Sequence, residues 1–373
     1  MSFFDNHSNW PLVTLKDIAT LKRGYDLPTK NRVEGDVPIY AANGINGSHN
    51  EVKIKGPGVI TGRSGTIGKV HFTEQDYWPL NTSLYVTDFH GNDPKWVFYM
   101  LRAFQLERYV EGAGVPTLNR NLVHDELVPL PPLAEQKRIA AILDKADAIR
   151  QKRKQAIDLA DEFLRSVFLD MFGDPVTNPK GWEVKSCKDL FKRITVGIVV
   201  KPSSYYVESG VPALRSLNIG YYGIRSENLV YVSKSDNESI LSKTRVYEGD
   251  LVIVRSGQPG KTAVVCKEFD GVNAIDILIA TPKEELIDPQ FFAFFMNSEG
   301  GKKIVLAEQR GQVQKHFNVG SLNSTAIPLP PLSLQRTFAE IVATVYGKYQ
   351  TNKVTEFNEI FNSISQKAFS GQL

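Results

Sequence analysis

One segment of this chain occurs twice, once in the middle and once near the end. The run PLPPL at residues 129–133 returns at residues 328–332. A long segment of helical character follows each copy, and Gln136 in the first aligns with Gln335 in the second. A repeat with so long a period is not that of a solenoid. The chain is therefore predicted to contain the same two-part module twice, a globular domain followed by a long helix.

Two further landmarks precede each proline run in the same order. Trp10 opens the first copy and Trp182 the second, and an Arg-Ser-Gly motif follows at 63–65 and at 255–257. The duplication therefore extends over almost the whole chain. If each copy of the module binds a ligand, the duplication suggests that the ligand also has two parts.

Composition places the chain among ordinary globular proteins. Hydrophobic residues make up 42% and charged residues 23%, and the formal net charge is only +3. Nucleic-acid-binding proteins usually show a clear basic excess, so composition alone does not reveal one here. The start of the sequence does not resemble a signal peptide, no apolar run reaches membrane-spanning length, and Cys187 and Cys266 lack zinc-ligand spacing. We expect a cytoplasmic protein with free thiols and no metal site.

The predicted fold class is α/β (α+β). Short strand-like runs bounded by glycine and asparagine alternate with helical stretches, for example at 94–110 and 288–298. The expected divisions are a first mixed α/β domain at 1–132, a central helix at 133–174, a second α/β domain at 175–331 and a C-terminal helix at 332–373.

The two long helices account for most of the remaining sequence. Apolar residues recur at heptad spacing from about Ala134 to Phe172 without an internal glycine or proline. A helix of that length would span roughly 58 Å. The second, from Ser333 to about Phe369, loses its phase across a polar stretch. Pairing the two helices with each other is the simplest way to bury both apolar stripes.

These repeated segments resemble the conserved regions of a type I restriction-modification specificity subunit. The resemblance rests on PLPPLAEQKRIAAIL, the helix ending in MFGDP, the second copy IPLPPLSLQR, and the loops TGRSGTIGKV and VRSGQPGKT. It implies two target-recognition domains that each read half of a split DNA site. It also implies an antiparallel coiled coil between them, with internal pseudo-two-fold symmetry. The expected partners are double-stranded DNA, two methyltransferase subunits and restriction-translocase subunits.

The resemblance also implies where chemistry and partner contacts lie. The chain itself would be non-catalytic, with S-adenosylmethionine, ATP and Mg²⁺ bound by partner subunits. One difference between the copies is that Glu135 precedes the first glutamine but Leu334 the second. The residues expected to contact partner subunits are Pro131, Pro132, Leu133, Gln136, Pro330, Pro331, Leu332 and Gln335.

The Arg-Ser-Gly loops are the first candidate DNA contacts. Glycines at these positions suit tight hairpin turns, and they also let backbone N–H groups approach a phosphate. An arginine beside such a loop could hold phosphate or reach a guanine edge, and the sequence leaves both open. The candidate residues are Arg63, Ser64, Gly65 and Lys69 in the first copy and Arg255, Ser256, Gly257 and Lys261 in the second.

The second of these loops has a superficial likeness to a nucleotide-binding loop. Gly260-Lys261-Thr262 follows a strand-like run, but a P-loop requires a glycine where Arg255 stands. The residues that follow favour a strand rather than the helix whose N-terminus would hold phosphate. The sequence therefore argues against a nucleotide site.

A polar loop before each proline run is the second candidate. Amide and basic side chains suit backbone and base-edge contacts, although an ordinary solvated loop has the same composition. The candidate residues are Asn119 and Arg120 in the first copy and Arg310, Gln312, Gln314 and Lys315 in the second.

No arrangement of residues typical of a catalytic site is visible in the sequence. Two other classes were weighed: a single-chain nuclease or NTPase, and a duplicated assembly adaptor that reads no DNA. Turnover by the isolated chain would favour the first, and failure of every duplex to compete above background would favour the second. Because the two domains differ between their landmarks, the expected DNA target is asymmetric.

Overall fold

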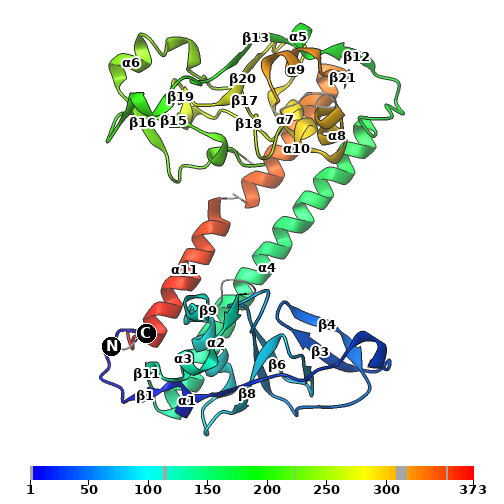
Figure 1. Ribbon diagram of the computed structural model, residues 1–373. Helices are drawn as coiled ribbons and strands as arrows, with labels where there is room; N and C mark the ends of the chain where they lie inside the picture. The colour runs from blue at the N-terminus through cyan, green and yellow to red at the C-terminus, as the bar shows by residue number, and fades with distance from the viewer. Residues whose placement is uncertain (1–2, 112–115, 222, 308–316, 350–351) are drawn as a thin grey trace. The chain divides into compact units, whose positions relative to one another are not determined.

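The chain divides into two compact units in the computed structural model, which describes residues 3–111, 116–221, 223–307, 317–349 and 352–373 (Figure 1). Unit 1 consists of Met1–Arg153 together with Val354–Leu373, and unit 2 is Lys154–Lys353. Each unit therefore contains one α/β domain, part of the central helix and part of the C-terminal helical region.

Unit 1 is built on an antiparallel four-stranded sheet in the order β2-β8-β5-β6. A second sheet has the order β4-β3-β7, and β1 pairs with β11. The strands are β1 (Leu12–Thr14), β2 (Thr20–Arg23), β3 (Val37–Ala41), β4 (Gly44–His49), β5 (Gly58–Gly62), β6 (Val70–Thr73), β7 (Trp78–Pro79), β8 (Ser83–Asp88), β9 (Val110–Glu111), β10 (Thr117–Leu118) and β11 (Leu127–Pro129). The helices before the central one are α1 (Leu15–Ile18), α2 (Pro94–Ala103) and α3 (Arg120–His124).

Unit 2 repeats this plan. Its main sheet has the order β13-β20-β17-β18, a second sheet has the order β14-β16-β15-β19, and β12 pairs with β21. The strands are β12 (Glu183–Ser186), β13 (Phe191–Val196), β14 (Tyr206–Val207), β15 (Val211–Leu214), β16 (Val230–Val232), β17 (Leu251–Val254), β18 (Thr262–Val264), β19 (Asn273–Ala274), β20 (Ile277–Pro282) and β21 (Ala326–Leu329). The helices are α5 (Cys187–Leu190), α6 (Lys234–Glu238), α7 (Pro289–Asn297), α8 (Glu299–Ala307) and α9 (Val319–Ser324).

The helix that follows each main sheet begins in the same way. Asp93 accepts a hydrogen bond from the backbone N–H of Trp96 and is followed by proline, and Asp288 caps α7 likewise. A carboxylate at this position satisfies N–H groups that have no partner within the helix. The first helix is shorter than the predicted span of 94–110, because Gln105 adopts a left-handed conformation (φ 52°) that ends it.

The central helix α4 runs from Leu133 to Phe172, as predicted, and Gly173 ends it with a φ of 78°. In unit 1, Ile139 and Leu143 of α4 are buried in one cluster with Phe361 of α11 (Asn352–Phe369). The Arg150 guanidinium reaches Asn358, and the Arg138 guanidinium donates to the carbonyl of Leu373 at 3.0 Å. Low numbers on one helix meet high numbers on the other, so this pairing is antiparallel.

The later part of α4 pairs in unit 2 with α10 (Leu332–Tyr349). Phe168 and Phe172 pack edge-on against Phe338, with ring centroids 5.5 Å apart in both pairs. The Tyr346 hydroxyl donates to Asp161 at 3.4 Å, so this pairing is also antiparallel.

One expectation for the helices is tested only in part, and one detail differs from the sequence prediction. The C-terminal helix was predicted from Ser333 to about Phe369; the described parts are α10 and α11, and residues 350–351 between them lie outside the described residues, so one continuous helix stays a prediction. Ile149 and Phe163, which fit the heptad stripe, are 52% and 53% exposed. The buried face of α4 is therefore narrower than its stripe of apolar residues, because each turn of α4 can face only one neighbour.

The chain termini meet within unit 1, where Figure 1 marks N and C side by side. The backbone N–H of His7 donates to the Ser370 carbonyl at 2.9 Å. The amide of Asn6 bonds both backbone polar groups of Trp10, as the amide of Asn178 does for Trp182. The N-terminal segment therefore lies next to the end of α11 in the same way that residues 174–182 come directly after α4 in the sequence. In this sense the repeat is circular.

Asp161 gives the α4–α10 pairing a predicted pH dependence. Burial raises the pKa of this carboxyl to about 6. A carboxyl that binds its proton more tightly in the folded state contributes less stability as pH rises from about 4 to about 6. Asp161→Asn should therefore exceed wild type in unfolding free energy at pH 8 by on the order of 1 kcal/mol, a value reduced because the side chain is only half-buried. Denaturant titrations at pH 4.5 and 8 test this, and a difference independent of pH would contradict it.

Among the described helices, none is long and apolar enough to cross a membrane. Cys187 is buried and Cys266 exposed, and neither forms a disulfide.

Candidate functional site

Both Arg-Ser-Gly loops connect antiparallel neighbours of a main sheet, β5 to β6 and β17 to β18. Gly65 and Gly68 have φ values of 83°, and Gly257 and Gly260 have values of 79° and 84°. The predicted hairpin turns with left-handed glycines are confirmed. The strand that follows the second loop also confirms that this loop does not lead into a phosphate-binding helix.

A backbone hydrogen bond joins the two candidate loop regions in each unit. The Leu118 N–H donates to the carbonyl of Arg63 at 2.8 Å, and the Phe317 N–H donates to the carbonyl of Arg255 at 3.1 Å. The next residues, Asn119 and Asn318, cap α3 and α9. In each unit, the Arg-Ser-Gly loop and the start of the segment before the proline run therefore lie together, although they are far apart in sequence. The two junctions occupy equivalent places in the two units.

Arg63 is half-buried beneath its loop. Its guanidinium donates to the carbonyl of Asn81 at 3.2 Å, and burial together with the charge of Arg23 lowers its pKa. Ser64 is half-exposed, whereas Gly65 and Lys69 are exposed. The first loop therefore offers an exposed backbone and ammonium group, with its arginine held just below.

Arg255 holds the matching position in unit 2 but is paired differently. Its guanidinium lies 2.6 Å from the carboxylate of Asp276, and its Nε is buried without a hydrogen-bond partner in the described structure. Ser256 is half-exposed and Gly257 exposed. To contact a base or a phosphate, this arginine would have to give up its ion pair with Asp276.

Lys261, the last basic residue of the second loop, is half-buried. Burial lowers its pKa, and so do the neighbouring charges of Arg225 and Lys302. An excess of positive charge therefore gathers at this end of the loop.

The pre-proline loops are described only in part. Asn119 uses its side-chain oxygen to cap α3 and donates from its amide nitrogen to Glu111, and exposed Arg120 reaches the carbonyl of Leu21 at 3.5 Å. Four predicted residues of the second copy lie outside the described residues: Arg310, Gln312, Gln314 and Lys315.

The two aligned glutamines attach each long helix to its α/β domain. The Gln136 side-chain oxygen accepts from the Asp93 N–H at 2.9 Å, and its nitrogen donates to Asn92 and to the carbonyl of Pro131. Gln335 does the same, accepting from Asp288 and donating to the carbonyls of Leu286 and Pro330.

Burial changes the interpretation of the predicted partner-contact residues. Gln136 and Gln335 are only 2% and 0% exposed, and Pro131 and Pro330 are also buried. These four are not on the surface, because their polar groups are used inside their own units. The exposed or half-exposed members of the set are Pro132, Leu133, Pro331 and Leu332.

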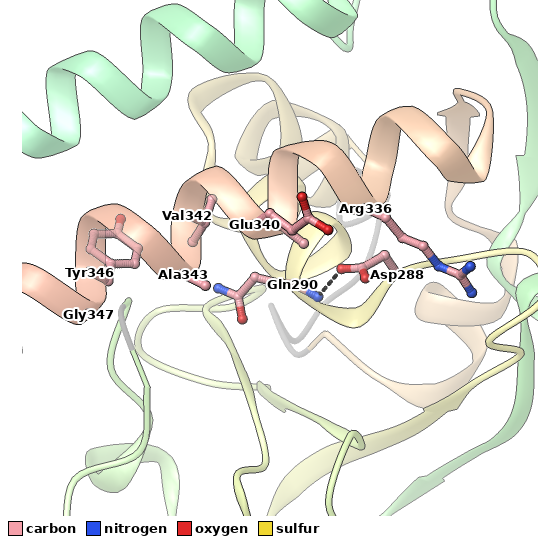
Figure 2. Close-up of a pocket in the computed structure, with 9 residues that line it drawn as sticks. Asp288, Gln290, Arg336, Glu340, Val342, Ala343, Tyr346 and Gly347 are labelled. Atoms are coloured by element: carbon pink, nitrogen blue, oxygen red, sulfur yellow. Dashed lines mark hydrogen bonds between the residues drawn. The ribbon is translucent and has the colours of Figure 1, made fainter.

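A groove of about 620 Å³ lies in unit 2 between the start of α7 and one face of α10. Figure 2 shows Asp288 near Arg336 and Glu340 at one end of the groove, the Gln290 side chain beside Ala343, and Tyr346 at the other end. The Asp288 carboxylate accepts from the backbone N–H of Gln290 at 2.8 Å.

The equivalent seam of unit 1 is closed by ionic contacts. Lys95 of α2 lies 3.0 Å from Asp144 of α4, and Arg102 lies 3.2 Å from Asp147. By the alignment of the two copies, Gln290 and Ala343 stand in unit 2 where Lys95 and Asp144 stand in unit 1. The two modules therefore share their fold but differ in how the helix meets the domain.

Two residues around Lys261 were not predicted from the sequence. Its ammonium lies 4.9 Å from the ring centroid of Tyr221, and that of Lys302 lies 4.8 Å from the same centroid. No sequence pattern connects these positions, because they come from separate loops and a helix. In the described part of the chain, no group of three His, Cys, Asp or Glu side chains could hold a metal ion.

The two units match one family model in turn. The type I restriction modification DNA specificity domain matches residues 7–159 and again 179–362, and the chain belongs to this family.

Individual relatives agree. The chain is 26% identical over 272 residues to the type I restriction enzyme MjaVIII specificity subunit of Methanocaldococcus jannaschii, covering 68% of this chain but only 63% of that protein. It is 22% identical to the MjaIX specificity subunit of the same organism, covering 98% and 94%. The crystal structure of the S subunit of a type I restriction-modification system from M. genitalium has the same fold, with a TM-score of 0.67 at 16% identity, covering 98% of this chain and 97% of that one.

Proposed function

We infer that this chain is the DNA-reading specificity subunit of a type I restriction-modification complex. Unit 1 and unit 2 would each read one half of a split, asymmetric site in double-stranded DNA. The observation that carries the proposal is the repeated junction of the two candidate loops, made by Leu118 and Arg63 in one unit and by Phe317 and Arg255 in the other. Two such junctions with different side chains suit two different half-sites.

The helices supply the second part of the proposal, a scaffold for partner subunits. Two methyltransferase subunits and the restriction-translocase subunits would assemble on the helical regions. Exposed apolar side chains on α4 support this, because Leu159 and Phe163 stand one helical turn apart and are 56% and 53% exposed. Pro132, Leu133, Pro331 and Leu332 remain candidate contacts.

The chemistry would belong to the partners. We assign no catalytic residue to this chain, and place S-adenosylmethionine, ATP and Mg²⁺ on the methyltransferase and restriction subunits. The complex would act in the cytoplasm.

Arg63 and Arg255 test the reading role. If each reads a base, its replacement by alanine should weaken binding of the target duplex by about 1–3 kcal/mol and relax specificity only in its own half-site. If each holds phosphate, binding should weaken equally on all duplexes, with a shallower salt dependence. Affinities of the assembled complex for target duplexes mutated in one half at a time distinguish the two roles.

The ion pair of Arg255 requires a control. Asp276→Asn removes its 2.6 Å partner but leaves the arginine in place. If loss of this pair alone explained the effect of Arg255→Ala, both variants would bind DNA equally weakly. Wild-type affinity in both arginine variants would show that the two loops are structural turns without a role in DNA binding.

A further inference from the structure

Two lysines from separate elements of unit 2 meet over the ring of Tyr221, and the charge of Arg225 acts on one of them. Lys261 comes from the β17–β18 loop, Lys302 from α8, and Arg225 follows the turn that carries Tyr221. The ammonium groups of the two lysines lie 4.9 and 4.8 Å from the ring centroid. Within the described structure, no carboxylate lies at ion-pair distance from either of these ammonium groups.

The cluster is held in place by the fold. The Asn297 side chain accepts from the Thr262 N–H at 3.0 Å and donates to the carbonyls of Thr262 and Tyr221. Gly260, just before Lys261, packs so closely on α8 that an added Cβ would lie 3.1 Å from the methyl groups of Val305. The loop, the turn and the helix are thus fixed to one another, and the ring stays 40% exposed.

Positive charges gathered without a carboxylate are unfavourable unless an anion from outside joins them. Burial and the charges of Arg225 and Lys302 lower the pKa of Lys261, as expected for an ammonium without a counter-charge. An aromatic face that holds two ammonium groups fixes their positions before a ligand arrives. Lysine is a common phosphate contact, acting as a point charge.

We propose that Lys261 and Lys302, which lie over the ring of Tyr221, bind backbone phosphates of the half-site that unit 2 reads, together with the neighbouring Arg225. The proposal rests on the proposed function and adds to it a defined phosphate site with two residues, Tyr221 and Lys302, outside the repeated motifs. The described residues of unit 1 do not repeat this site. In unit 1 a Cβ at Gly68 would meet the carboxylate-bearing side chain of Glu107, where unit 2 has Val305 of α8.

Salt dependence measures such contacts directly. Each phosphate contact contributes about 0.9 to the slope of log affinity against log salt. Lys261→Gln and Lys302→Gln, which remove the charge but keep a polar side chain, should each cut the affinity ratio between 50 and 200 mM salt by about threefold. The loss should be the same on target and unrelated duplexes, because phosphates carry no sequence information.

The measurement uses the chain assembled with its methyltransferase subunits and fluorescent duplexes. Lys234→Gln is the matched control, since its ammonium is 3.9 Å from the Glu238 carboxylate and its side chain is 81% exposed. Tyr221→Phe keeps the ring and should bind as wild type, whereas Tyr221→Leu should weaken binding with the slope nearly unchanged. Thermal unfolding of each variant confirms that it is folded.

The outcomes separate this proposal from the function on which it rests. A double Lys261→Gln/Lys302→Gln variant with the wild-type slope would overturn the phosphate site while leaving DNA reading intact. So would a loss confined to binding of the methyltransferase subunit, which would make the cluster a protein contact. A wild-type complex that prefers no duplex at any salt concentration would instead refute the proposed function.

Discussion

Replacing Gln335 with leucine is expected to lower the unfolding free energy of unit 2 by about 2–4 kcal/mol. The side chain is fully buried and makes three hydrogen bonds, to the N–H of Asp288 and the carbonyls of Leu286 and Pro330. Leucine fills similar space but leaves these groups without partners, and each buried polar group left unpaired costs about 1–3 kcal/mol. Denaturant titration of the full chain gives the loss directly.

The control is a glutamine-to-leucine change at Gln290, which lies at the surface of the junction between α10 and the α/β domain. Gln290→Leu, in the groove beside Asp288, removes no side-chain hydrogen bond seen among the described residues and should change stability by less than about 0.5 kcal/mol. Gln136→Leu should reproduce the large loss in unit 1. Equal and small losses at Gln335 and Gln290 would contradict the role of the buried amide as the link between helix and domain.

Lengthening the helical pair is expected to change the spacing of the DNA target. Four residues inserted after Arg153, where the two units divide, with a matching insertion between residues 350 and 351, would add about 6 Å. One base pair advances about 3.4 Å, so the preferred gap between half-sites should grow by one or two base pairs. Methylation of a series of targets that differ only in this gap measures the change.

The half-site sequences themselves should not change, because neither α/β domain is altered. Two inserted residues serve as the control, since they rotate the following apolar face by about 200° and should disrupt packing. A four-residue variant that remains folded and assembled but keeps the original spacing would show that the helices do not set the gap.

Features encoded by neighbouring residues were predictable from the sequence. The span of α4 followed from its heptads and from the glycine that ends it, and the hairpin loops followed from Gly65 and Gly257. The duplication was visible because the proline runs and glutamines keep the same spacing in both copies. These signals work because helix periodicity and positive φ are local requirements.

Features that depend on distant residues were not predictable. The family resemblance implied a partner contact at Gln136, but its amide completes the start of α2, far back in the sequence. Tyr221 and Lys302 have no motif, and only the fold brings them to Lys261.

The central claim is that two different domains of one chain read two halves of one DNA site. Sequencing that detects modified bases, applied to DNA from cells expressing this chain with its methyltransferase subunits and from cells lacking this chain, tests it most directly. The account predicts a split, non-palindromic modified sequence with an unspecific gap, present only with this chain. If Arg255 reads a base, Arg255→Ala should relax only the half that unit 2 reads, whereas Lys261→Gln should leave the modified sequence unchanged. A continuous palindrome, or modification that does not depend on the chain, would contradict the account.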